Sequence, residues 1–407
     1  MNKIKCITLV AFVLGSATTF AAKDSTFHVQ NSVRVGYDDN IYQSREGNQQ
    51  ETAFIADIIN ISGDADFSQR TSLEYFWQPE FRYRFDADPK FVTYQDLYAR
   101  LSHALSQRTF LELSDRFRYQ DKGGQSDLPG SSQDQNYLEN DLMGSLSYVL
   151  NTLSQIKVGA GYEFRTWDDD NYGKWTFNPG FNRYVGGNNY DNIRADGSYI
   201  RELKADTTHG YLGANYMNLK YDGNRGGFDS TTLYGGLDHN FNPKVLGTAQ
   251  LGYSFSSVES GDASTGASGS SEDTSAPFLQ LALDYSSTDR TTFTGSLGYS
   301  LSQSQNSIYN ASDAFDVSLG VQHDLTGKIS LSSTLAYIFS MYDSNYSAYG
   351  FGDAEEDFFR FSLRGSYQIN RNNFVDLGYE FSLRDSDSIF LQEYNRNRID
   401  FGWRLRL

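Results

Sequence analysis

Arginines at alternating positions are the residues with the clearest chemical potential in this chain. They recur as Arg82 and Arg84 and again as Arg116 and Arg118. In an extended strand, residues two apart point to the same face, so each pair would present two guanidiniums to one side. A guanidinium offers forked N–H donors to carboxylate, phosphate or sugar oxygens. The spacing therefore indicates a polar surface suited to anionic or hydroxyl-rich solutes.

The same strands carry carboxylates, which leaves two interpretations open. The arginines expected on this surface are Arg34, Arg82, Arg84, Arg116, Arg118, Arg360, Arg364, Arg384, Arg398, Arg404 and Arg406. The carboxylates expected beside them are Glu74, Glu80, Glu112, Asp376, Glu380 and Asp400. Arginines paired with these acids would form a structural lattice, whereas unpaired arginines would bind a passing solute. We expect the lattice first and keep the solute track as the functional alternative.

Five histidines could supply the base of a hydrolase, which would need a histidine beside a serine or a carboxylate. They are His28, His103, His209, His239 and His323. In the strand pattern of this chain, all five fall near short turns, far from the outer rim where hydrolases built into a barrel wall place their catalytic groups. We therefore expect no catalytic residue and no enzyme.

Acidic residues outnumber basic ones by 51 to 34, which gives a formal net charge of −17. This balance argues against nucleic acid, which requires basic patches. The acids cluster in expected loops, for example at 168–170 and 355–357. Such clusters could bind Ca²⁺, but none has the spacing of an EF-hand loop, so we expect solvated loop charge and no metal site. The single cysteine, Cys6, lies in an expected signal peptide, and no cofactor is expected.

The elements that would hold these residues are strands. Along residues 73–85 the odd positions are leucine, proline or aromatic, while the even positions include Glu74, Glu80 and the arginine pair. Residues 398–407 alternate in the same way, and no helix could sort them so cleanly. Strands of this kind occur in soluble sandwiches too. Their length, near the ~9–11 residues that a tilted strand needs to cross a bilayer, favours an all-β transmembrane antiparallel up-and-down barrel.

Connections between the strands alternate between long and short. The long ones are 38–51, 86–90, 121–136, 167–190, 222–228, 258–275, 304–312, 342–355 and 384–392. Short turns are expected near 68–71, 106–109, 151–152, 204–205, 242–244, 288–290, 326–328 and 370–373. Nine long loops and eight turns predict about eighteen strands, with sixteen possible because 167–190 could hold extended structure. An even number places both ends of the barrel chain on the side of the short turns.

The N-terminus predicts export. Lys3 and Lys5 precede the apolar run 7–14 and then small residues, which is the order of a secretory signal peptide. Cleavage is expected after Ala21, so that residues 1–21 are the signal and 22–407 form a single barrel domain. The first strand would begin within a few residues of the cleavage site, which leaves no segment for a plug.

A barrel of this size predicts a water-filled channel, because about 16–18 strands enclose an aqueous interior. The longest loop, 167–190, is rich in glycine and aromatic residues. Its candidates for a constriction are Trp175, Phe177, Phe181 and Tyr184. These side chains could fold into the channel, stack on sugar rings or pack over its mouth.

Two segments resemble known families. In the last strand, Asp400, Gly402, Leu405 and Leu407 resemble the C-terminal assembly signal of bacterial outer-membrane β-barrels, although Leu407 replaces the commoner aromatic residue. This resemblance implies the outer membrane of a Gram-negative-type bacterium, with lipid and the barrel-assembly machinery as partners.

The second segment is Val33-Arg-Val-Gly-Tyr-Asp-Asp-Asn-Ile-Tyr42. With the Ser/Thr-x-Arg-Thr turns, it resembles the β-barrel porins of the second type, a family linked to exopolysaccharide secretion. The resemblance implies a passive outer-membrane port for a polar solute or a polysaccharide, which a periplasmic export partner could feed. A surface role in adhesion through the acidic loops is the non-transport alternative.

Overall fold

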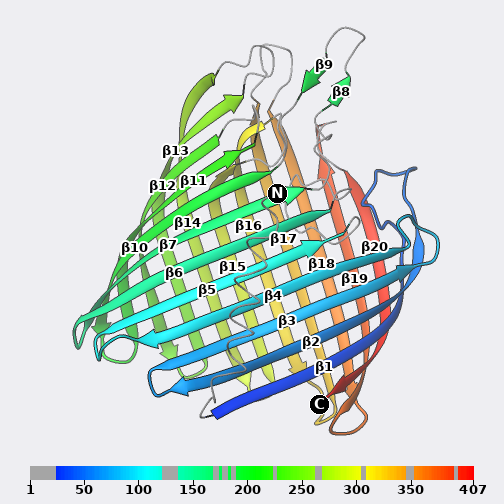
Figure 1. Cartoon of the computed structure of the whole chain (residues 1–407), viewed down its shortest axis with the longest axis horizontal. Coiled ribbons are helices and arrows are strands. Elements are labelled where there is room, and N and C mark those ends of the chain that lie inside the picture. The colour runs from blue at the N-terminus through cyan, green and yellow to red at the C-terminus, as the bar shows by residue number, and fades with distance from the viewer. Residues whose placement is uncertain are drawn as a thin grey trace.

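The structure, a computed structural model, describes residues 24–121, 136–167, 174–176, 182–184, 189–222, 227–261, 268–303, 309–344, 353–388 and 393–407. Eighteen strands form one closed antiparallel sheet, and two short strands form a separate hairpin (Figure 1). The predicted fold class and strand number are confirmed. The described residues include no helix long and apolar enough to cross a membrane.

The strands of the barrel follow one another around the cylinder in chain order. They are β1 (Asp24–Asp38), β2 (Thr52–Ser68), β3 (Thr71–Arg84), β4 (Phe91–Ala104), β5 (Thr109–Gln120), β6 (Tyr137–Asn151), β7 (Ser154–Trp167), β10 (Tyr190–Lys204), β11 (Thr208–Tyr221), β12 (Gly227–Asn242), β13 (Val245–Gly261), β14 (Ser268–Thr288), β15 (Thr291–Gln303), β16 (Tyr309–Asp324), β17 (Ile329–Ser344), β18 (Ala354–Gln368), β19 (Asn373–Ser386) and β20 (Tyr394–Arg406). The hairpin of β8 (Lys174–Thr176) and β9 (Asn182–Tyr184) lies in the longest connection, so β7 pairs with β10.

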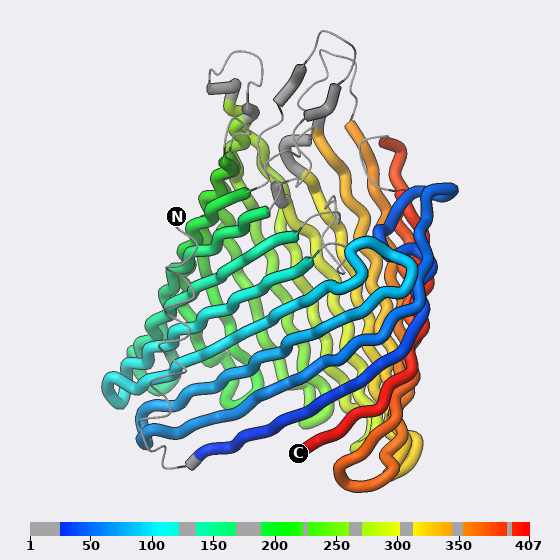
Figure 2. The backbone as a smooth tube through the Cα atoms, turned by 45° about the vertical axis from the view of Figure 1, so that its right-hand side comes forward, coloured from blue at the N-terminus to red at the C-terminus, as the bar shows by residue number. Residues whose placement is uncertain are grey.

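The cylinder closes between its first and last strands. β1 and β20 pair in antiparallel register from Gln30 opposite Arg406 to Asp38 opposite Arg398. Figure 2 shows β1 in blue beside β20 in red, with the strands tilted around the cylinder. Every barrel strand therefore has two hydrogen-bonded neighbours, and no sheet edge is left open.

The two faces of each strand have opposite chemistry, and the apolar face is outside. In β20, Ile399 is 49% exposed and Phe401 is 52% exposed, whereas Asp400 between them is 6% exposed. A soluble protein would hide the first two and expose the third. This arrangement fits a wall with hydrocarbon on its outer side and polar groups inside.

A repeated hydrogen-bond pattern closes several short turns. In the turn after β2, the Arg70 backbone N–H donates to Ser68 Oγ at 3.1 Å, and Ser68 Oγ donates to Thr71 Oγ1 at 3.1 Å. The same two bonds recur at 106–109 and at 288–291. A hydroxyl that caps its own turn is a known function of serine and threonine. The Ser/Thr-x-Arg-Thr repeat is thus a structural device for hairpins.

One connection is shorter than the sequence predicts. The serine, aspartate and glutamate content of 258–275 predicts a loop, yet β13 continues to Gly261 and β14 starts at Ser268. Val258 pairs with Glu272 and Glu259 pairs with Ser271 in this extension. Alternation of apolar and polar residues marks only the part of a strand that meets lipid. It therefore misses strand ends that are polar on both faces.

A charge placed on the outer face should weaken the barrel. Leu251 of β13 is 65% exposed on that face. We expect Leu251→Arg to lower the free energy of unfolding by about 2–4 kcal/mol if this position lies near the middle of the membrane. Unfolding by urea in lipid vesicles, followed by tryptophan fluorescence, measures the change. Gln250→Arg, on the opposite face of the same strand, is the control and should have a much smaller effect; equal losses would contradict the assignment of faces.

Candidate functional site: the charged wall of the barrel interior

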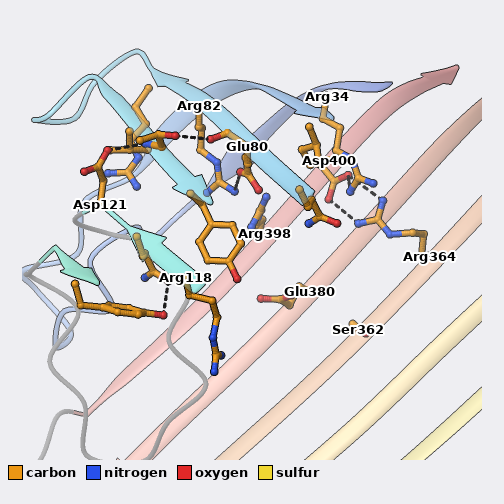
Figure 3. Close-up of a pocket in the computed structure, with 18 of the residues that line it drawn as sticks. Arg34, Glu80, Arg82, Arg118, Asp121, Ser362, Arg364, Glu380, Arg398 and Asp400 are labelled. Carbon is orange, nitrogen blue, oxygen red and sulfur yellow. Dashed lines mark hydrogen bonds and ion pairs between the residues drawn. The ribbon is translucent and has the colours of Figure 1, made fainter. Parts of the chain in front are cut away.

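A cavity of about 670 Å³ lies inside the barrel. Its lining includes Arg165 of β7 and Ser362 of β18, strands that lie on opposite sides of the cylinder. Side chains from these strands can line one cavity only in the interior. Figure 3 shows the charged lining residues, with Arg82, Glu80 and Arg398 near one another.

The lining of this cavity, called the main cavity below, is strongly charged. Its seven arginines are Arg34, Arg82, Arg84, Arg118, Arg165, Arg364 and Arg398, and its five carboxylates are Glu80, Asp121, Glu163, Glu380 and Asp400. Several tyrosines also contribute, among them Tyr94, Tyr137 and Tyr190. The excess of guanidiniums gives the cavity a net positive lining.

Most arginines of the sector formed by β18, β19, β20 and β1 are paired. Asp400 accepts hydrogen bonds from Arg34 and from Arg364, each at 3.2 Å (Figure 3). Arg360 donates to Glu380 at 3.1 Å, beside this pair. The arginines of these four strands thus form one contiguous surface, but its charge is largely compensated by the carboxylates.

Further predicted residues join the same lattice. Arg404 donates to both oxygens of Asp376 at 2.9 Å, and Arg82 forms an ion pair with Glu80. Glu74 pairs with Arg100, an arginine that the sequence pattern did not single out. These three pairs favour the structural lattice over a continuous track of free guanidiniums.

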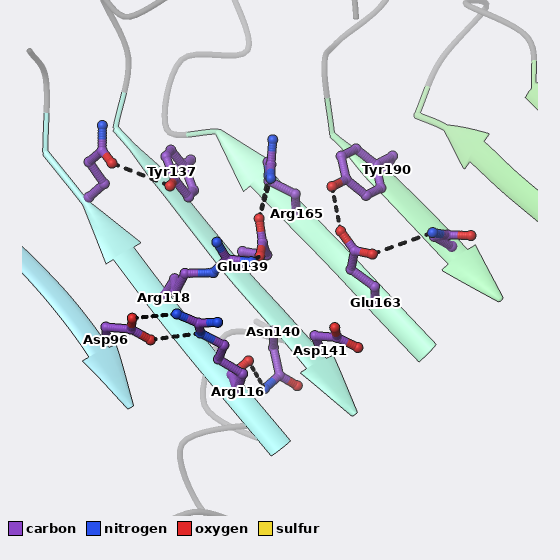
Figure 4. A network of polar contacts seen from close by, with 12 residues as sticks. Asp96, Arg116, Arg118, Tyr137, Glu139, Asn140, Asp141, Glu163, Arg165 and Tyr190 are labelled. Atoms are coloured by element: carbon purple, nitrogen blue, oxygen red, sulfur yellow. Dashed lines mark hydrogen bonds and ion pairs between the residues drawn. The ribbon is translucent and has the colours of Figure 1, made fainter. Parts of the chain in front are cut away.

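A second network links β4, β5, β6 and β7 (Figure 4). Arg116 donates to both carboxylate oxygens of Asp96, at 3.0 and 2.7 Å. Glu139, which is 1% exposed, lies between Arg118 and Arg165 and forms an ion pair with each. The Arg165 guanidinium also lies 5.0 Å from the Tyr137 ring centroid. This network ties four neighbouring strands together.

The remaining predicted residues are placed less centrally. Arg384 is fully buried, with Nε 3.7 Å from Glu356 Oε1. Glu112 lines a different cavity of about 380 Å³, together with Lys157. Arg84 is buried in the lining of the main cavity. Whether any of these residues takes part in conduction stays a prediction.

The constriction candidates of the long loop are only partly described. Trp175 lies in β8 and Tyr184 in β9, whose backbones pair as a hairpin. Phe177 and Phe181 lie outside the described residues, as does the expected signal peptide. These predictions stay predictions.

Residues 36–41 of the segment 33–42, Gly-Tyr-Asp-Asp-Asn-Ile and called the motif 36–41 below, have a structural role that the sequence did not reveal. Asp38 and Arg396 are each 1% exposed, and Arg396 Nε donates to Asp38 Oδ1 at 2.9 Å. Asp39 accepts a hydrogen bond from the Asn397 backbone N–H at 2.7 Å, and Asn40 Nδ2 donates to the Asn395 carbonyl at 2.9 Å. The motif therefore clasps the first strand to the last at the outer end of the closing seam.

The opposite wall of the barrel has a different composition. The six consecutive strands from β12 to β17 contain no arginine or lysine over their described spans. Their inner face carries hydroxyl pairs between strands, such as Thr232 with Ser254 at 2.8 Å and Ser296 with Ser318 at 2.6 Å. Asp238 accepts a hydrogen bond from Thr248 on this wall. The interior is thus divided into a charged wall and a hydroxyl-rich wall.

The histidines lie where the strand pattern places them, next to the short turns. Three of them share a 2.8 Å hydrogen bond with the first threonine of a neighbouring strand. The pairs are Thr71 with His103, Thr208 with His239, and Thr291 with His323. Three copies of one contact around the barrel indicate a structural role in the hairpins. Among the residues that the structure describes, no group of three or more histidine, cysteine or acidic side chains is arranged to hold a metal.

A closed eighteen-stranded barrel that is apolar outside and charged inside defines a porin-like outer-membrane β-barrel. Residues 262–407 match the model of the family described as Putative beta-barrel porin 2. This match confirms the predicted resemblance, although the motif 33–42 that suggested it lies outside the matched part. No sequence among the curated proteins matches the chain.

Several solved structures resemble the barrel. OccAB4 of Acinetobacter baumannii has a TM-score of 0.47 and 10% identity, covering 95% of this chain and 99% of the other. OccK2 (OpdF) of Pseudomonas aeruginosa has a TM-score of 0.49 and 10% identity, with the same coverage. A BenF-like porin from Pseudomonas fluorescens Pf-5 has a TM-score of 0.49 and 11% identity, covering 95% and 100%.

Proposed function

We propose that this barrel is a passive channel for hydroxyl-rich polar solutes such as saccharides, including segments of a secreted polysaccharide. The observation that carries the proposal is the divided interior. The charged wall is held by mutual ion pairs, whereas the wall from β12 to β17 carries mainly small hydroxyl side chains and no arginine or lysine in its strands. Small side chains leave space along that wall for a solute.

The chemistry of the hydroxyl wall suits sugars. A serine or threonine hydroxyl both donates and accepts hydrogen bonds, and so does each sugar hydroxyl. Carboxylates such as Asp238 add acceptors for sugar O–H groups. A solute that exchanges one such bond for another can move along the wall without a large free-energy barrier. Flow would be driven by the concentration gradient of the solute.

Export and assembly complete the proposal. Residues 1–21 would direct secretion and be removed, and residues 22–407 would form the barrel. The last strand, β20, would be read by the barrel-assembly machinery, with membrane lipid against its apolar face. A periplasmic partner would be needed if the solute is a polysaccharide under export.

Conductance of the purified protein tests the channel. The refolded protein in a planar bilayer is expected to give single-channel current steps, and liposomes that contain it should swell in neutral sugars. Ser296→Arg with Ser318→Arg should lower the conductance, because two long side chains would then occupy the hydroxyl wall. The alanine pair at the same positions is the control and should conduct like the original. The absence of any steps above background would defeat the proposal and favour a surface role such as adhesion.

A further inference from the structure

Arg398 differs from the other arginines around it. It lies on the inner face of β20 and lines the main cavity. Its side chain forms no hydrogen bond or ion pair with any described residue, although its guanidinium carbon lies 4.8 Å from the Phe54 ring centroid. A guanidinium away from bulk water is stable only when an anion or acceptor compensates it. Its surroundings therefore call for a partner that the described chain does not supply.

The two carboxylates that stand opposite Arg398 in the sheet are already engaged. Asp38 and Glu380 stand opposite Arg398 on its two neighbouring strands. Asp38 forms a bidentate pair with Arg396, and Glu380 accepts from Arg360. Each acid thus directs its hydrogen bonds to another arginine and not to Arg398.

A second guanidinium lies over the same Phe54 ring, which is called the platform below. Arg82 lies 4.9 Å from the centroid of the Phe54 ring that Arg398 also contacts, and Arg82 pairs with Glu80. With Arg360 and Arg396, four arginines of this cluster face the three carboxylates Asp38, Glu80 and Glu380. Each of these carboxylates pairs with one of the other three arginines, so Arg398 has no carboxylate of its own within the cluster.

The motif 36–41 builds this arrangement. A Cβ atom at Gly36 would clash with the Phe54 ring and would lie 2.6 Å from the Ile399 carbonyl oxygen. Glycine at this position is what allows the Phe54 ring to sit against β1. The neighbouring Asp38 then holds Arg396, two residues before Arg398. The platform and the strand that carries Arg398 are thus fixed by the same segment.

We propose that Arg398, beside Arg82 on Phe54, binds a carboxylate of an acidic saccharide inside the channel. A guanidinium without a carboxylate of its own matches the single charge of a solute carboxylate, which it can bind with two parallel N–H bonds. Tyr94 of the same cavity provides an aromatic ring on which a sugar ring can stack. This inference rests on the proposed channel function and specifies its solute as a saccharide that carries a uronate group.

Current block in planar bilayers tests the site. Trigalacturonate is expected to interrupt the current of the original protein, and neutral maltotriose at the same concentration is not. In Arg398→Gln the half-blocking concentration should rise at least about tenfold, because one charge-assisted pair is lost. Arg100→Gln, which removes a lumen arginine outside this cavity, is the matched control and should leave the block unchanged.

Each other outcome would overturn the assignment. A half-blocking concentration within about twofold of the original in Arg398→Gln would remove Arg398 from the site. Equal block by maltotriose would show that the site does not recognise a carboxylate. Block by inorganic phosphate but not by trigalacturonate would show that the site recognises phosphate instead. The absence of current steps would instead defeat the channel itself. If Arg398→Gln does not fold, Phe54→Leu provides the second test, because loss of the platform should weaken the block in the same direction.

Discussion

Arg396→Gln is expected to lower the free energy of unfolding by about 3–5 kcal/mol, because it leaves the Asp38 carboxylate buried without its partner. Both residues of the pair are 1% exposed, and Arg396 Nε contacts both Asp38 oxygens, at 2.9 and 3.1 Å. Water cannot replace the guanidinium there without opening the seam between β1 and β20. The urea concentration at the midpoint of unfolding in lipid vesicles measures the loss.

Two further variants separate the buried charge from a general effect of mutation. Asp38→Asn combined with Arg396→Gln removes both charges and should recover most of the stability, since no uncompensated ion remains. Arg100→Gln breaks a pair whose side chains are 42% and 46% exposed, so its effect should stay below about 1 kcal/mol. Equal losses in Arg396→Gln and Arg100→Gln would show that the clasp does not stabilise the barrel.

Glu139→Gln should have a comparable effect, again about 3–5 kcal/mol, because one buried carboxylate serves two guanidiniums. Glu139 is 1% exposed, Arg165 donates to it through Nε at 2.8 Å, and Arg118 pairs with its other oxygen. The substitution leaves Arg165 uncompensated beside the rings of Tyr137 and Trp167, and Arg118 loses its carboxylate partner as well.

The same urea titration measures this change. Asp141→Asn offers a matched comparison on the same strand, since Asp141 pairs with Arg194 and both side chains are about 30% exposed (27% and 30%). We expect a clearly smaller loss there, because water can solvate the remaining arginine. If Glu139→Gln unfolds at the same urea concentration as the original protein, the network of Figure 4 does not hold these strands together.

The sequence predicted the wall of the barrel better than its interior contacts. Alternation in β3 and β20 is strong because lipid demands an apolar residue at every second position, so strand number and face followed directly. Turn residues such as Ser68 and Thr71 placed the hairpins, since their hydroxyls close the turn. The polar ends of β13 and β14 were wrongly predicted as loop, because both faces of these strand ends meet water and show no alternation.

Pairing inside the barrel depends on register and on side-chain reach, which alternation does not encode. Glu80 and Asp376 were predicted to pair with arginines, and each forms an ion pair with one. Glu139 and Asp96 were not singled out, because they lie on strands where the apolar face is less regular. Arg398 was one arginine among many in the pattern. Only the register together with the side-chain contacts shows that both of its acidic neighbours bind other arginines.

The hydrogen bonds between β1 and β20 determine when the barrel can close relative to synthesis of the chain. β1 leaves the ribosome before the other strands, but its second neighbour is the strand synthesised after all of them. Until then an incomplete sheet would have two unpaired edge strands, and each could pair with a strand of another chain. Completion of the ring is therefore a late event, and the segment around Asp38 must wait for nearly the whole polypeptide before it meets its partner.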